Sequence, residues 1–208
     1  CTALVNLNCA KNALESLEAS GLTSLSYLYC NTNALTSLSV NGCTGLQRLF
    51  CQTNSLTSLD VTECAALSDL VCSYNQLNAL DVSQNTALEY LDCWMNAIES
   101  LNLAHNPNLE VLYCDGNELT TLDTTACTAL TDMYCEDNPL TSVNTILEGA
   151  HISLTASGNG YVGLIYDTGY EYYGVIATPA TGAAFYDWTD AADAQVSTMA
   201  VTDILPET

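Results

Sequence analysis

The segment Leu88–Leu109, LEYLDCWMNAIESLNLAHNPNL, indicates the fold because its pattern returns every 21 residues along the chain. Each period contains a cysteine and, three residues later, an asparagine. The cysteines are Cys9, Cys30, Cys51, Cys72, Cys93, Cys114 and Cys135, and the asparagines are Asn12, Asn33, Asn54, Asn75, Asn96, Asn117 and Asn138. Seven in-phase matches of two unrelated residue types exclude chance, so the sequence predicts a repeat protein.

The leucines of each period complete the pattern L-x-x-L-x-C-x-x-N, as in Leu88, Leu91, Cys93 and Asn96. At a period of roughly 20 to 29 residues, this pattern is typical of a leucine-rich-repeat solenoid, whose coils bury their apolar side chains against one another. We therefore predict about seven to eight coils of 21 residues, with the solenoid over residues 1–150. A degenerate eighth coil is expected because Leu154, Ala156 and Asn159 keep the phase.

Each coil consists of two related half-units, such as residues 77–87 and 88–97. Neither half-unit has the 3.6-residue apolar spacing of an amphipathic helix, so both are expected to be extended. The predicted fold class is therefore mainly β, with short strands on both sides of the coil. The nested repeat and its cysteine ladder resemble the leucine-rich repeats of bacterial surface proteins, in particular the listerial internalin type. This resemblance implies an extracellular or cell-surface adhesion protein.

The spacing of the 11 cysteines argues against zinc and against disulfides. One thiol per coil does not converge on a tetrahedral site, and thiols on parallel strands about 4.8 Å apart have the wrong geometry for a disulfide. We expect buried free thiols, no metal site and no cofactor. The asparagine amides are expected to satisfy backbone groups where the chain turns. Cys43, Cys64 and Cys127 replace Asn85 and Asn106 at the other turn, which is expected to be closed by backbone bonds alone.

Residues 151–208 are predicted to form a strand-rich capping module, with short antiparallel strands near 152–156, 161–166, 171–177, 184–188 and 195–201. The A-T-P-A-T-G stretch (177–182) and the pair Phe185 and Trp188 resemble a small β-rich repeat module of bacterial surface proteins. Tyr161, Phe185 and Trp188 would form its core. The ending Leu205-Pro206-Glu207-Thr208 resembles part of a sortase sorting signal, and a tag or chance is the competing explanation. Cys1 falls in mid-repeat, which predicts that upstream sequence has been removed.

Charge excludes several classes of partner. Lys11 and Arg48 are the only basic residues against 24 acids, and a net charge of −22 disfavours nucleic acid and anionic membrane surfaces. No run of 18 apolar residues occurs, so membrane insertion is not expected. His105 and His151 belong to no catalytic motif, and we predict a protein that is not an enzyme. Stacked acids such as Asp60 and Asp81 leave a weaker hypothesis of calcium binding.

Aromatic residues gather on one predicted face. If Leu91 and Cys93 point inward, residues 90, 92 and 94 point outward on a concave sheet. The expected ligand-binding residues are Tyr27, Tyr29, Phe50, Tyr90, Asp92, Trp94, Tyr113, Asp115 and Tyr134. Trp94 is expected to lie at the centre, flanked by Tyr90 and with Phe50 and Tyr113 as its stacked neighbours. Aromatic ladders also stabilise sheets, so packing is the competing explanation.

Two functions follow from these patterns. The first is an extracellular binding or adhesion protein that recognises a protein or glycan through the aromatic and acidic face. The alternative is a structural subunit of a surface layer or filament, which self-associates through the apolar edge of the N-terminal coil at Leu4, Leu7 and Leu14.

Overall fold

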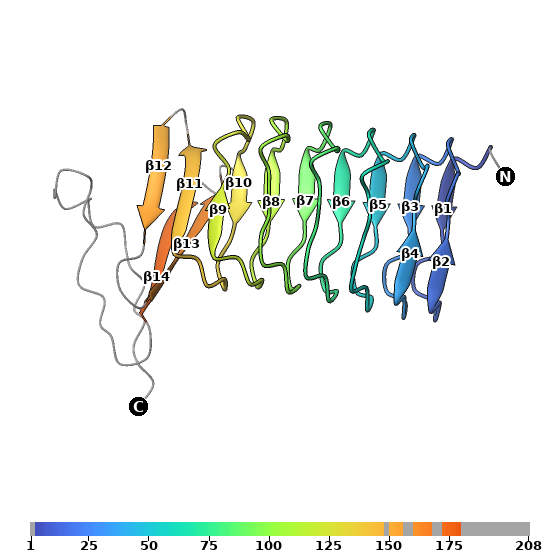
Figure 1. Ribbon diagram of the computed structural model, residues 1–208, viewed down its shortest axis with the longest axis horizontal. Helices are drawn as coiled ribbons and strands as arrows, with labels where there is room; N and C mark the ends of the chain where they lie inside the picture. The colour runs from blue at the N-terminus through green and yellow to red at the C-terminus, as the bar shows by residue number, and fades with distance from the viewer. Residues whose placement is uncertain (1–2, 148–149, 156–159, 168–171, 180–208) are drawn as a thin grey trace.

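The computed structural model describes residues 3–147, 150–155, 160–167 and 172–179. These residues form a β-solenoid whose coils follow one another along a nearly straight axis (Figure 1). No helix occurs in the described ranges, as the sequence predicted. In particular, no described segment forms a helix long and apolar enough to cross a membrane.

One parallel sheet runs the length of the solenoid, with one strand from each coil (Figure 1). Its strands, in spatial order, are β1 (Asn6–Asn8), β3 (Tyr27–Tyr29), β5 (Arg48–Phe50), β6 (Asp69–Val71), β7 (Tyr90–Asp92), β8 (Val111–Tyr113) and β10 (Asp132–Tyr134). Each residue pairs with the residue one period later, so that Leu49 pairs with Leu70 and Leu70 with Leu91. The 21-residue period of the sequence is therefore the register of the main sheet.

The opposite side of the coil forms strands only near the two ends of the solenoid. There, β2 (Ser16–Glu18) pairs with β4 (Ser37–Ser39), and β9 (Thr121–Asp123) pairs with β11 (Ser142–Leu147). Between them the chain is extended without strand pairing. The backbone hydrogen bond from Thr36 N to Glu15 O, near the N-terminal end, measures 2.9 Å. The equivalent bond in a middle coil, from Glu99 N to Asn78 O, is longer, at 3.4 Å. The prediction of strands on both sides is thus correct only for the end coils.

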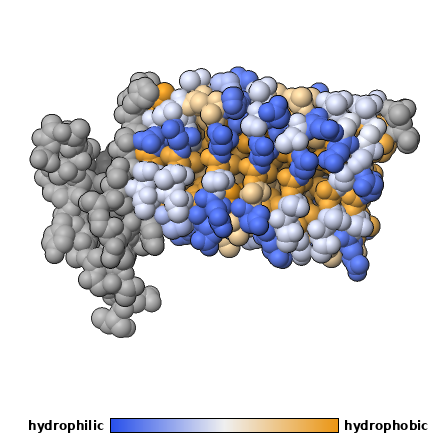
Figure 2. All heavy atoms as spheres, viewed as in Figure 1, coloured by the Kyte–Doolittle hydropathy of each residue, from blue (hydrophilic) through white to orange (hydrophobic). Residues whose placement is uncertain are grey.

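The core is a continuous stack of leucines and cysteines. The central strand residues Leu28, Leu49, Leu70, Leu91 and Leu112 are all fully buried. Burying a leucine side chain contributes roughly 1.5 to 3 kcal/mol, so this row is a main source of stability. Apolar surface remains visible between rows of hydrophilic residues on the side of the solenoid shown in Figure 2.

The ladder cysteines are inside this core. Cys30, Cys51, Cys72, Cys93 and Cys114 are buried free thiols, which confirms the predicted packing role. Burial raises the pKa of Cys51, Cys72 and Cys114 well above the ordinary value of a thiol. These thiols are consequently neutral at physiological pH and pack as small apolar groups.

The expected eighth coil is wrong. The chain instead reverses after β11, which pairs antiparallel with β12 (Ala150–Thr155). Next, β13 (Gly160–Asp167) pairs antiparallel with β10 and with β14 (Tyr172–Pro179), so the main sheet ends in two antiparallel strands (Figure 1). One sequence change accompanies the reversal: Glu148 stands where earlier coils have Asn106 or Cys127. A carboxylate cannot donate the hydrogen bond that closes those earlier turns.

The three described strands of the C-terminal region lie where the sequence predicted strands near 152–156, 161–166 and 171–177. The strands predicted near 184–188 and 195–201 lie outside the described residues, as do Phe185, Trp188 and residues 205–208. Tyr161 belongs to β13, but its side chain is outside the description. The division of the chain at residue 150 stays a prediction.

Candidate ligand-binding face

Two polar ladders fix the turns that carry the candidate face. In the first, the Asn75 amide donates to Cys51 O at 3.1 Å and to Cys72 O at 3.0 Å, and its Oδ1 accepts from Leu56 N at 3.0 Å. Asn54 and Asn96 repeat this set of bonds one coil before and after. Each asparagine therefore ties its own coil to the preceding one, which confirms its predicted structural role.

The second ladder lies at the other turn. Asn85 Nδ2 donates to Val61 O at 2.9 Å, and the Cys43 thiol donates to the equivalent carbonyl of Ala19 at 3.1 Å. Cys64 and Cys127 make the same contact at 3.7 and 3.8 Å. The expectation that backbone bonds alone close these turns is therefore wrong, because the thiol takes the place of the amide donor.

Beyond each strand of the main sheet, the chain turns through a residue with a left-handed backbone. The positive φ angles are those of Lys11, Thr32, Thr53, Tyr74, Met95 and Asp137, with Gly116 at the same position of its coil. Bulky residues rarely adopt this conformation. Tyr74 and Met95, with φ of 52° each, therefore occupy an unfavourable position, and both side chains are 45% exposed.

The predicted inward and outward alternation of the main strands is confirmed. Leu91 and Cys93 are fully buried, whereas Tyr90 and Asp92 are half-buried and Trp94 is 37% exposed. The other strand aromatics of the predicted site, Tyr27, Tyr29, Phe50, Tyr113 and Tyr134, are half-buried on the same face. We call this surface the sheet face.

The aromatics of the sheet face form separate groups. Tyr29 stacks on Phe50 at a centroid distance of 5.0 Å near the N-terminal end. Tyr113 stacks on Tyr134 at 4.9 Å and contacts Tyr90 at 5.9 Å. Val71 and Asp92 occupy the row positions between these two groups. The exposed stripe that the sequence predicted is therefore interrupted, and its half-buried rings have a packing role.

Trp94 belongs to neither group. It lies two residues beyond Asp92, at the turn, and its ring contacts Tyr74 at 4.8 Å with an angle of 64° between the planes. The expected stacking between Phe50 and Tyr113 is wrong, because β6 separates the Phe50 strand from β7 and Tyr113 pairs with Asp92. We call Tyr74, Trp94, Met95, Asp92 and Asp115 the Trp94 corner.

Gly116 supports the corner from the next coil. A Cβ atom at this glycine would lie 2.7 Å from Met95 Sδ and 3.4 Å from Trp94. The missing side chain thus leaves the room in which Met95 and Trp94 pack. Sequence patterns did not identify Gly116, although its phase, equivalent to Tyr74 and Met95, was the available signal.

The carboxylates of the corner are partly desolvated. Asp92 accepts hydrogen bonds from Trp94 N at 3.2 Å and from Ser73 Oγ at 2.9 Å, yet burial still raises its pKa. Burial, together with the negative charges of Glu136, Asp92 and Asp137, raises the pKa of Asp115 to about 7. Burial also raises the pKa of Glu136, whose Oε2 is buried with no hydrogen-bond partner among the described residues. Close acids in this setting favour a bound positive charge.

The opposite side of the coil has acids for another reason. Asp60 and Asp81 accept hydrogen bonds from the hydroxyl and the backbone N–H of the residue two positions later, Thr62 and Ser83 respectively. These bonds lower the pKa of both carboxyl groups. Asn102 makes the same turn with Ala104 N at 3.1 Å. These side chains shape turns, so the lack of aromatics at their position has a structural explanation.

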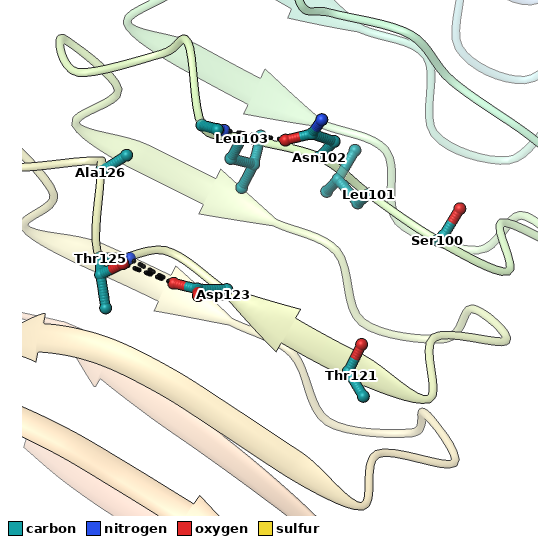
Figure 3. A pocket seen from close by; sticks show the side chains of 9 residues that line it. Ser100, Leu101, Asn102, Leu103, Thr121, Asp123, Thr125 and Ala126 are labelled. Atoms are coloured by element: carbon teal, nitrogen blue, oxygen red, sulfur yellow. Dashed lines mark hydrogen bonds between the residues drawn. The ribbon is translucent and has the colours of Figure 1, made fainter.

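A groove of about 300 Å³ lies on this opposite side, between the coils of Asn102 and Asp123 (Figure 3). The figure shows Asp123 bonded to Thr125, whose N and Oγ1 lie 2.9 and 2.6 Å from Asp123 Oδ1. Because its principal polar groups are already paired, the groove is a weaker candidate than the Trp94 corner.

His105 is exposed. In the described part of the chain, no three His, Cys, Asp or Glu side chains group to hold a metal ion.

Solved structures provide three informative comparisons. The functional domain of InlJ from Listeria monocytogenes, which includes a cysteine ladder, is 40% identical over 67% of this chain, with a TM-score of 0.57. A leucine-rich-repeat protein of Leptospira interrogans is 28% identical over 68%, with a TM-score of 0.62. YopM, a leucine-rich effector protein of Yersinia pestis, shares the fold at 23% identity over 69% of this chain and a TM-score of 0.58.

The similarity is confined to part of each neighbour, since this chain spans 36% of the InlJ structure, 39% of the Leptospira structure and 46% of the YopM structure. No family profile matches the chain. No curated protein sequence shows significant similarity to it. The parallel register, the buried thiols and these neighbours agree, and the described coils form a leucine-rich-repeat solenoid that carries a cysteine ladder.

Proposed function

We propose that this chain is a non-enzymatic binding module of an extracellular or cell-surface bacterial protein, and that it recognises a protein through the Trp94 corner and the adjoining sheet face. The observation that carries the proposal is the grouping of exposed hydrophobic side chains. Tyr74, Trp94 and Met95 are three of the four large hydrophobic residues that are exposed in the described part of the chain, the fourth being Val5. Apolar groups gathered within a polar surface mark interaction sites.

The composition of the corner supports recognition rather than packing. Interfaces are enriched in aromatic residues and methionine, and energetically dominant residues are often tryptophan or tyrosine. The stacked pairs Tyr29–Phe50 and Tyr113–Tyr134 are explained by sheet packing. Every coil uses a left-handed residue at the turn, but Tyr74 and Met95 place bulky, exposed side chains there, where smaller residues fit with less strain. The resemblance to internalin-type repeats supports the adhesive and extracellular part of the proposal.

The test compares Trp94→Ala with Val5→Ala, a truncation of the exposed hydrophobic residue in the first coil. Both variants and the parent chain are applied to arrays of purified extracellular proteins and of glycans, and each is melted in parallel. We expect a protein ligand that loses at least tenfold in affinity with Trp94→Ala and is unaffected by Val5→Ala, while both melts stay close to that of the parent. If the parent chain and both variants bound every ligand equally, the result would contradict a binding role for the corner and would indicate a structural one. A glycan that meets the same criteria would replace the protein ligand.

A further inference from the structure

The sheet face already holds one positive charge between a ring and a carboxylate. Arg48 Nε lies 3.4 Å from Asp69 Oδ2, and the Arg48 guanidinium carbon lies 5.9 Å from the centre of the Tyr27 ring. These residues occupy the same row on three successive strands, because Tyr27 pairs with Arg48 and Arg48 with Asp69. The repeat therefore presents an aromatic ring and an acid at the spacing that a guanidinium can bridge.

The Trp94 corner repeats this chemistry without the cation. The Trp94 ring contacts Tyr74, and Trp94 N donates to Asp92 two residues earlier in the same coil. Asp115 lies one period after Trp94, in the next coil, where its backbone O accepts from Met95 N at 3.1 Å. The acids here are crowded, since the charges of Glu136, Asp92 and Asp137 all act on Asp115. Lys11 and Arg48 are the only basic residues of the whole sequence, and they belong to the first and third coils. Neither of these two basic side chains is placed to neutralise the corner.

We propose that the Trp94 corner binds an arginine side chain of a partner protein. The inference rests on the proposed function and names the chemistry of its ligand. The guanidinium group stacks on the exposed ring of Trp94, while its N–H groups donate to the Asp115 carboxylate. Asp92 is already engaged by Trp94 N and Ser73 Oγ, so it contributes mainly charge.

Geometry favours a guanidinium over a sugar. The planes of Trp94 and Tyr74 meet at 64°, so the rings form two walls rather than one flat platform. A planar cation can stack on one wall and form paired hydrogen bonds to a carboxylate, which a lysine ammonium matches less well. The net charge of −22 also attracts a basic partner over long range.

Nuclear magnetic resonance with the full chain tests the inference. The 15N-labelled protein is titrated with a peptide that carries two arginines among glycines and serines. Matched peptides carry lysine or citrulline, the neutral isostere of arginine, in place of arginine. The readout is the indole N–H signal of Trp94, which is assigned by its absence from Trp94→Ala and is distinct from that of Trp188. We expect the arginine peptide to shift the Trp94 signal alone, the lysine peptide to bind several-fold more weakly, and the citrulline peptide to have no effect.

Two variants with the same charge change separate a specific site from general attraction. Asp115→Asn lies at the corner, whereas Asp81→Asn removes an exposed acid on the opposite side. We expect Asp115→Asn to weaken arginine binding at least fivefold and Asp81→Asn to leave it within twofold. Trp94→Phe keeps an aromatic face and should retain most of the affinity. It is the control for the possibility that Trp94→Ala loses binding because it misfolds.

Three results would overturn the inference: no shift of the Trp94 signal at millimolar arginine peptide, an equal shift with citrulline, or equal weakening by both acid variants. A neutral oligosaccharide that shifts the same signal in place of the arginine peptide would also overturn it. The array experiment does not depend on these results. A protein ligand that requires Trp94 would still support the proposed function if the arginine inference failed.

Discussion

Removing one amide from the centre of the asparagine ladder should separate neighbouring coils. Asn75→Ala deletes donations to Cys51 O and Cys72 O and leaves Leu56 N without its acceptor. Cys51, Leu56 and Cys72 are fully buried and Asn75 is half-buried, so water replaces the lost bonds only in part. An unsatisfied buried backbone group costs roughly 1 to 3 kcal/mol, and we expect Asn75→Ala to lower the free energy of unfolding by about 3 to 4 kcal/mol.

The first coil provides a matched control. Asn12 donates only within its own coil, to Cys9 O at 2.9 Å and Ala10 O at 3.1 Å, and it is exposed. Because no described coil precedes it, Asn12→Ala should cost less than about 1 kcal/mol. Asn75→Asp keeps an acceptor for Leu56 N but places a carboxylate against two carbonyls, so it should be at least as destabilising as Asn75→Ala.

Urea unfolding followed by circular dichroism gives the midpoint and slope for each variant, and a changed slope would reveal coils that unfold separately. Amide exchange at Leu56 reports the local opening directly. The reasoning would be refuted if Asn75→Ala were within about 1 kcal/mol of the parent chain, or if Asn12→Ala cost as much as Asn75→Ala.

Three further changes test other parts of the structure. Cys72→Ser should cost about 1 to 3 kcal/mol by burying an unpaired hydroxyl, and the native ladder thiols should stay unreactive to thiol reagents until the chain is denatured; rapid native labelling would contradict this. Folding raises the pKa of Asp115 from 3.8 to about 7, so the charge on Asp115 destabilises the fold increasingly as pH rises through this window. After allowance for solvent screening, Asp115→Asn should stabilise the fold by about 1 to 2 kcal/mol near pH 8 and should have no effect near pH 3. Thermal melts at both pH values measure this difference. Gly116→Ala, with φ of 61° and a contact to Met95, should destabilise more than Gly21→Ala, which has φ of 73° and open space; urea midpoints that are equal would show that Met95 moves freely.

The 21-residue period was enough to predict the solenoid, because a fixed period converts sequence distance into spatial contact. Residues 21 apart, such as Leu70 and Leu91, are neighbours in a parallel sheet. The same period identified the buried thiols and the asparagine ladder, and the alternation within Leu91, Asp92 and Cys93 identified the sheet face. These features depend only on backbone periodicity and on apolar burial, and the pattern of residue types predicts both.

The tertiary structure alone decided where the repeat ends and which rings meet. The sequence predicted short antiparallel strands in the tail, and β13 and β14 pair in this way. It did not predict that the chain reverses directly after β11, so that β12 pairs with β11 and β13 with β10, because parallel and antiparallel strands show the same alternation. Trp94 lies beyond strand β7 and contacts Tyr74, while Val71 and Asp92 separate the two aromatic groups of the sheet face. The raised pKa of Asp115 likewise depends on burial by neighbouring coils, a property of packing that no single repeat contains.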